Sequence, residues 1–251
     1  MKGLMLHCGA DAVDRDTLGS LRLPQPKGAR HFIRPFIEDV DMIDDLLQQV
    51  DMPIKSEAFG VKFDDDKVTP KQFFGLLELE GGKDEHGLMV GLRGSYDQTL
   101  SRGIAVGSRV FVCDNLCFSG EIEIKTKQTL DIDARIGDLL TTAIGQVPRL
   151  LNFQGERFDR YRLTQVGQTV GNSMLTDMVR SGILNASQIG RALAEWDRPS
   201  HDEHAEDGWS LWRLHNAVTE ALKPTNTANN AVQRNWDRTI NMTRMLDEVR
   251  V

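Results

Sequence analysis

The first half of this chain carries strand patterns and the second half carries helical patterns, with a single switch near residue 130. Between residues 57 and 126, short runs that alternate in polarity or are rich in β-branched residues recur between turn segments. From residue 131 onward, apolar residues recur at intervals of three and four, the spacing of a buried helix face. Strands followed by helices, rather than alternating with them, predict an α+β fold. We expect an antiparallel sheet over about residues 55–128 and then a helical second half.

The expected elements of the first half follow from local signals. We expect a helix over 39–50, capped by Asp39 or Asp41, because its apolar residues form one stripe. Residues 17–35 hold several prolines and predict irregular structure. The expected strands are four to six in number and include 57–63, 72–80, 88–92, 109–113 and 121–126, with a hairpin loop at 81–87.

The spacing of apolar residues in the second half predicts five helices. The first covers 131–151, with Pro148 near its end or at a kink, and the second covers 158–183, with Gly167 and Gly171 as weak points. Ser187 is the expected N-cap of the third. We expect one domain over 1–251, in which 1–130 is mostly a β meander with an early helix and 131–251 is a helical subdomain. The remaining helices are expected at 187–196, 210–222 and 232–249.

Composition limits the classes of function. No run of about 18 apolar residues occurs, so we expect no membrane partner. The apolar patch near the N-terminus is too short for a signal peptide, and three cysteines form no even disulfide framework, so a cytoplasmic location is expected. A net charge of −7 argues against a broad, sequence-independent DNA binder, although a local basic groove stays open.

Five segments give the chain a family resemblance. They read LHCGADAV, HFIRPF, QFFGLLEL, GLRGSYDQTLSRGIAVGSRVFVCDNLCFSGEI and WSLWRLHNAVTEALK. Together they resemble the phage/plasmid-like proteins, domain-of-unknown-function family 932, over about residues 6–245. The resemblance implies a phage or mobile-element protein in a bacterial host cytoplasm. Many members carry a histidine where this chain has Gln128, which lowers the expectation of a histidine-dependent enzyme.

One polar cluster is the candidate binding site. Its arginines could form a fork onto a phosphate or carboxylate, oriented by the acidic and amide side chains. Alternatively, the cluster is a buried or half-buried ion-pair network that fixes hairpin register, with Asp114 and Asn115 as turn residues. The candidate residues are Arg93, Ser95, Asp97, Arg102, Arg109, Asp114, Asn115, Lys125 and Lys127.

Other chemistry-bearing residues are expected to be structural. Cys113 and Cys117 lack the further ligands of a metal site and are expected to be small buried residues. His201 and His204 are expected in a solvated loop. The glycine-rich segments do not open a phosphate-binding helix. We therefore expect no cofactor, no metal and no assigned catalytic residue. The four tryptophans could stack on bases, but core or interface packing is favoured; they are Trp196, Trp209, Trp212 and Trp236.

Three hypotheses on function remain open. The first is a non-catalytic factor in mobile-element replication or recombination that binds single-stranded nucleic acid or nucleoprotein. It predicts that Arg93, Arg102, Arg109, Lys125 and Lys127 share one exposed surface. The second is a factor that binds a host protein and blocks or redirects a defence system through the acidic segments 39–45 and 64–66. The third is an enzyme whose pocket holds the arginine, aspartate and asparagine cluster. A homo-oligomer is compatible with all three.

Overall fold

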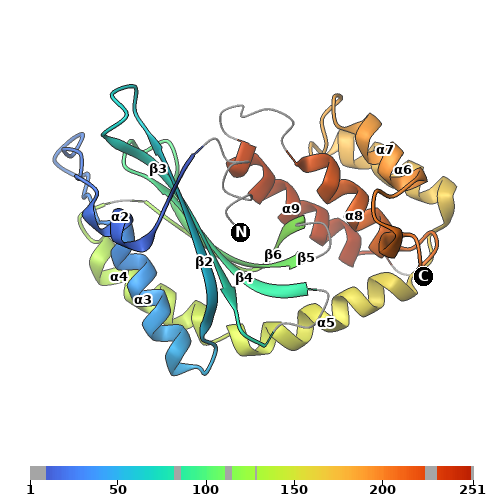
Figure 1. The fold of residues 1–251 in the computed structure, drawn as a ribbon, viewed down its shortest axis with the longest axis horizontal. Helices are drawn as coiled ribbons and strands as arrows, with labels where there is room; N and C mark the ends of the chain where they lie inside the picture. The colour runs from blue at the N-terminus through green and yellow to red at the C-terminus, as the bar shows by residue number, and fades with distance from the viewer. Residues whose placement is uncertain (1–9, 82–85, 111–114, 128, 224–230, 250–251) are drawn as a thin grey trace.

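The computed structural model describes residues 10–81, 86–110, 115–127, 129–223 and 231–249. A twisted antiparallel sheet forms the centre of the molecule (Figure 1). Three helices lie on one side of the sheet, and a group of later helices lies on the other side and beyond its end. The fold is therefore α+β, with the sheet in the first half of the chain and most helices in the second.

The sheet is a meander whose strands are ordered β1-β2-β3-β4-β5-β6, and every neighbouring pair is antiparallel. Each strand thus pairs with its neighbour in sequence, and only the connection between β1 and β2 is long enough to hold helices. β1 and β6 are the two edge strands of this sheet. The strands are β1 Asp11–Val13, β2 Ile54–Phe63, β3 Pro70–Leu79, β4 His86–Ser95, β5 Arg102–Val110 and β6 Asn115–Thr126.

One face of the sheet packs against α2 (Arg15–Ser20), α3 (Phe36–Gln49) and α4 (Ile132–Ile144). Even-numbered residues of β4, such as Leu88 and Val90, point to this face because side chains alternate along a strand. Gly94 lets α3 approach closely, since a Cβ there would lie 2.7 Å from a ring carbon of Phe36. This face therefore holds the larger of the two cores that involve the sheet.

The second half forms a separate helical core. It is centred on α8, where residues 211–219 are all buried, and it includes the rings of Phe158, Trp196 and Trp212. Ser210 caps α8 by accepting a hydrogen bond from the backbone N–H of Arg213. The helices are α5 Val147–Leu163, α6 Gly167–Arg180, α7 Ile189–Asp197, α8 Leu211–Leu222 and α9 Ala231–Asp247, with a short 3₁₀ turn at Asp202–His204.

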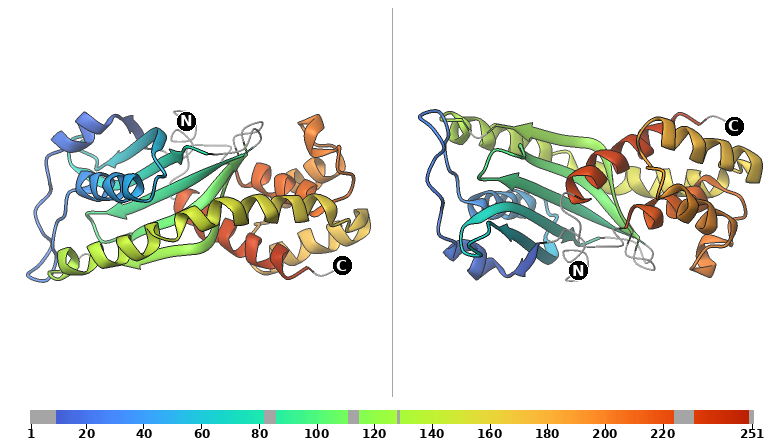
Figure 2. Two further views of the ribbon diagram at one scale, coloured as in Figure 1. Left: turned by 90° about the horizontal axis from the view of Figure 1, so that it is seen from below. Right: turned by 90° about the horizontal axis from the view of Figure 1, so that it is seen from above.

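Two helices connect the sheet to the helical core. α5 begins beside the sheet, where Leu150 joins the first core, and ends in the helical core with Phe158 (Figure 2, left). α9 places Trp236 and Ile240 against the other face of the sheet and Leu246 in the helical core (Figure 2, right). These two helices hold the halves together, and α9 is the one that reaches the candidate cluster.

Several sequence-based boundaries were wrong. α3 begins at Phe36 after Pro35, so neither Asp39 nor Asp41 is its N-cap. Part of the segment expected to be irregular forms α2. Pro148 lies in the first turn of α5, so the expected helix over 131–151 ends at Ile144. Proline suits a helix start because the first N–H groups need no intrahelical partner.

The expected helix over 158–183 is also two helices. Gly167 begins α6 with φ of +73°, a left-handed conformation that interrupts the helix and suits glycine. The prediction that Ser187 caps α7 was wrong as well. Gln188 is the N-cap residue, and the side chain of Gln188 makes no capping hydrogen bond. Among the described residues, no helix combines the length and apolar character needed to cross a membrane.

Candidate functional site

Arg93 of β4 and Lys125 of β6 come together although 32 positions separate them in the numbering. Both residues pair with Gly103 of β5, so the three form one row across the sheet. Their cations approach one carboxylate oxygen from α9: Asp237 Oδ1 lies 3.0 Å from Lys125 Nζ and 3.8 Å from Arg93 Nη2. We call the place of this carboxylate the anion position.

Trp236 forms one wall of the anion position. Its ring lies under the Arg93 guanidinium, 4.5 Å from ring centroid to Cζ. Its indole N–H donates to Glu123 Oε1 at 3.1 Å, and Lys125 Nζ forms an ion pair with the same oxygen at 2.8 Å. Glu123 therefore fixes both the indole and the lysine, and Trp236 itself is packed with Ile240 and Ala105.

Arg93 lies flat across the sheet because β5 has no side chain at Gly103. A Cβ at Gly103 would lie 3.1 Å from Arg93 Nε and 3.3 Å from its Cγ. The Arg93 side chain is 1% exposed, and within the described part of the chain neither Nε nor Nη1 has a hydrogen-bond partner. Burial lowers the pKa of Arg93, while the negative charges of Asp237 and Glu123 oppose that change.

Access to the anion position differs between its two cations. The side chains of Lys125 and Asp237 are 42% and 43% exposed, so the position opens to solvent on their side. The burial of Arg93 places it at the inner end. The arrangement can hold a single anion between an accessible ammonium and a buried guanidinium.

Arg102 lies on the opposite face of the sheet from Arg93. It forms an ion pair with Asp39 of α3, donates from Nη2 to the backbone oxygen of Arg34 at 2.7 Å, and stacks over Phe36. Its side chain is 2% exposed. The expectation that Arg93 and Arg102 share one exposed surface is therefore wrong, and the buried ion-pair alternative describes Arg102.

The remaining members of the cluster are dispersed. Ser95 accepts from the backbone N–H of Leu100 and donates to its carbonyl, and the Asp97 carboxylate accepts from Thr99, so both close the β4–β5 turn. The hydrogen bonds to Thr99 lower the pKa of Asp97 against the opposing effect of burial. Lys127 is exposed just after β6. Arg109 lies on β5, and Asn115 lies at the start of β6 rather than in the predicted turn. Asp114 lies outside the described residues, as do Cys113 and Gln128.

The acidic segments proposed for protein binding are partly occupied. Asp39 is buried against Arg34 and Arg102, and Asp41 and Asp44 pair with Arg15. The carboxylate of Asp66 accepts hydrogen bonds from the Thr69 hydroxyl and from the backbone N–H groups of Thr69 and Val68, and these hydrogen bonds lower the pKa of Asp66. Asp45 and Asp65 are exposed. The usable acidic surface is therefore smaller than the sequence indicates.

The histidine expectation was wrong for His204. His204 is 4% exposed, and burial lowers its pKa to about 4. His215 lies in the helical core, where neither ring nitrogen has a hydrogen-bond partner among the described residues and burial lowers its pKa to about 3. No group of three or more acidic, histidine or cysteine side chains within the described part of the chain could hold a metal ion.

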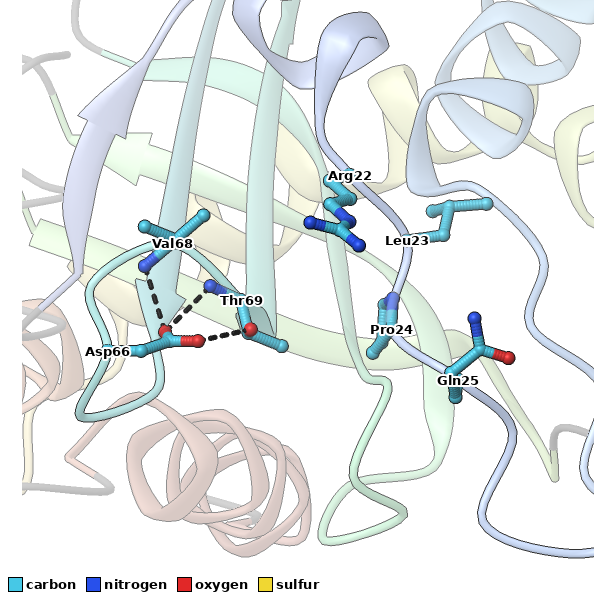
Figure 3. Close-up of a pocket in the computed structure, with 7 residues that line it drawn as sticks. All are labelled: Arg22, Leu23, Pro24, Gln25, Asp66, Val68 and Thr69. Atoms are coloured by element: carbon cyan, nitrogen blue, oxygen red, sulfur yellow. Dashed lines mark hydrogen bonds between the residues drawn. The ribbon is translucent and has the colours of Figure 1, made fainter.

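A hollow of about 320 Å³ lies away from the anion position, between residues 22–25 and the β2–β3 turn (Figure 3). Arg22 extends from one side and Asp66, Val68 and Thr69 line the other. None of the candidate cluster lines it. The enzyme hypothesis required a pocket that holds that cluster, and this hollow does not meet the requirement.

Sequence reasoning missed Asp237, Glu123 and the site role of Trp236. The sequence did offer one signal: Asp237 directly follows Trp236 in the predicted last helix, so a charged residue stands next to an expected core residue. Its position over β6 depends on how α9 packs, which local patterns do not encode. Comparison with known protein families, with curated proteins and with solved structures finds no match to this chain.

Proposed function

We propose that this chain binds single-stranded nucleic acid as a non-catalytic accessory factor in replication or recombination of a phage or other mobile element. The supporting observation is the convergence of Arg93 and Lys125 on one solvent-accessible anion position. The family resemblance supplies the mobile-element setting and is part of the proposal, as is a location in the bacterial cytoplasm.

A nucleic-acid strand fits this site better than a lone small anion because it presents repeated phosphates. Lys127 is exposed two residues beyond Lys125, and two residues of extended chain span about 7 Å. The two lysines can therefore follow a strand, while Arg93 contacts one of its phosphates. The net charge of −7 opposes tight binding at a distance, so we expect moderate affinity that depends on these few contacts.

The test is binding of a labelled single-stranded oligonucleotide to the full chain across a salt series. We expect a micromolar or tighter Kd at low salt that weakens as salt is added, because each phosphate contact releases counterions. An oligonucleotide duplex of the same sequence is the comparison. Absence of binding at low salt would refute the proposal.

A second candidate function, binding of a host protein, is supported by individual exposed apolar side chains on α5 and α6. Phe153 and Leu163 on α5 are 46% and 83% exposed, and Val170 on α6 is 52% exposed. Exposed large apolar side chains are typical of protein contact sites when they lie together. Affinity capture from a bacterial host with the wild type and with Leu163→Ser tests this candidate. A defined host protein lost from the variant would support it, and equal capture by both would refute it.

A further inference from the structure

We infer that Asp237 is an internal surrogate for a nucleic-acid phosphate, and that strand binding replaces its carboxylate with a phosphodiester between Lys125 and Arg93. This inference rests on the proposed function and adds a regulated step to the same site. A carboxylate and a phosphodiester are both single anions with two terminal oxygens, so one can take the place of the other beside the same donors.

The geometry of Arg93 indicates that Asp237 is an incomplete partner. Arg93 Nη2 and Asp237 Oδ1 lie 3.8 Å apart, beyond hydrogen-bond distance. The Arg93 side chain is 1% exposed, and its Nε and Nη1 have no hydrogen-bond partner among the described residues. Asp237 is carried by α9, which Trp236 anchors on the sheet, so its carboxylate reaches toward Arg93 from a fixed backbone position. A phosphate on a separate strand is free of that tether and can reach charge-assisted hydrogen-bond distance, about 2.8 Å.

The exchange requires little rearrangement of the protein. The Asp237 side chain is 43% exposed, so rotation of this one side chain moves its carboxylate into solvent. Trp236 is 1% exposed and bonded to Glu123, so the wall of the site stays in place. While Asp237 occupies the anion position, stray anions are excluded from it, and a strand that also contacts Lys127 can displace the carboxylate.

Asp237→Asn tests the inference because the amide keeps the size of the side chain and removes the charge. The matched control is Asp45→Asn, which changes the net charge by the same amount. Asp45 is exposed and lies on α3, on the opposite face of the sheet from α9. We expect Asp237→Asn to lower the Kd for a single-stranded oligonucleotide about tenfold or more. Asp45→Asn should change it less than about twofold, since an exposed charge distant from the site is screened by salt.

Lys125→Gln in the Asp237→Asn background should abolish the gain. Lys125 is exposed, so this variant is expected to fold, and its thermal midpoint is compared with that of the wild type. DNA and RNA strands of one sequence are both measured, and a gain with either supports the inference. Equal effects of Asp237→Asn and Asp45→Asn would overturn the inference while leaving the proposed function intact. Failure of all the proteins to bind either strand would overturn both.

Discussion

Replacement of Asp39 by alanine should destabilise the protein strongly, because this carboxylate is the ion-pair partner of a buried arginine. Asp39 is buried and pairs with both Arg34 and Arg102. Arg34 has further acidic partners in Asp133 and Glu38. For Arg102, Asp39 is the only ion-pair partner among the described residues, so the substitution leaves one buried guanidinium without a counter-charge.

The expected cost follows from that asymmetry. Removing one partner of a buried pair and leaving the other charged costs about 3–5 kcal/mol. Arg102→Leu should cost less, about 1–3 kcal/mol, because Asp39 keeps its hydrogen bond from Arg34 Nε at 2.9 Å. For a chain of this size, each kcal/mol corresponds to about 2–4 °C in Tm, so Asp39→Ala should lower Tm by roughly 10 °C.

Thermal and urea unfolding followed by circular dichroism measure both effects. Asp45→Ala is the matched control, since Asp45 lies on the same helix, is exposed, and should change stability by less than about 0.5 kcal/mol. A loss for Asp39→Ala no larger than that of Asp45→Ala would refute the structural role of the pair. A larger loss for Arg102→Leu than for Asp39→Ala would refute the argument from unequal partners.

Three further predictions concern the helical half. A Cβ at Gly171 would lie 2.2 Å from Trp196, so Gly171→Ala should cost about 2–3 kcal/mol in urea unfolding, whereas Gly137→Ala, with no atom within 4 Å, should be neutral or stabilise by up to about 1 kcal/mol. Since burial lowers the pKa of His215 to about 3, the unfolded chain binds the extra proton first, and this residue should lower stability by about 1.4 kcal/mol per pH unit from pH 6.5 toward 3; His215→Phe should remove this part of the slope and leave the part due to His204, whose pKa is lowered to about 4. Asp247 accepts from Tyr161 at 2.8 Å and pairs with Arg157 at 3.0 Å, so Asp247→Ala should lower stability by about 2–3 kcal/mol, and an equal effect of the exposed Glu248→Ala would contradict this.

The sequence predicted the fold class because its signals are local. Alternation and turn residues mark most of the strands, and three-and-four spacing marks the helices. The predicted helix boundaries were wrong where one residue type is compatible with two structural roles. Pro148 can end a helix or begin one, and the neighbours of Asp39 did not distinguish a cap from a buried ion-pair partner.

The candidate site was only partly predictable. Arg93 and Arg102 are close in sequence, but a turn separates them and places their side chains on opposite faces of the sheet. Strand alternation could indicate this only once the register of β4 against β5 is known. Asp237 was beyond reach for a different reason, since its contact with Lys125 spans 112 residues and depends on the packing of α9.

The central claim is that Lys125 contacts a nucleic-acid phosphate, and the salt dependence of binding tests it most directly. The slope of log K against log salt, measured with a single-stranded oligonucleotide, is compared for the wild type, Lys125→Gln and Lys67→Gln. Lys67 is an exposed lysine in the β2–β3 turn and is the control. Loss of one phosphate contact should reduce the slope by about 0.7 for a single strand. We expect that reduction for Lys125→Gln and none for Lys67→Gln; equal slopes for all three proteins would contradict the account.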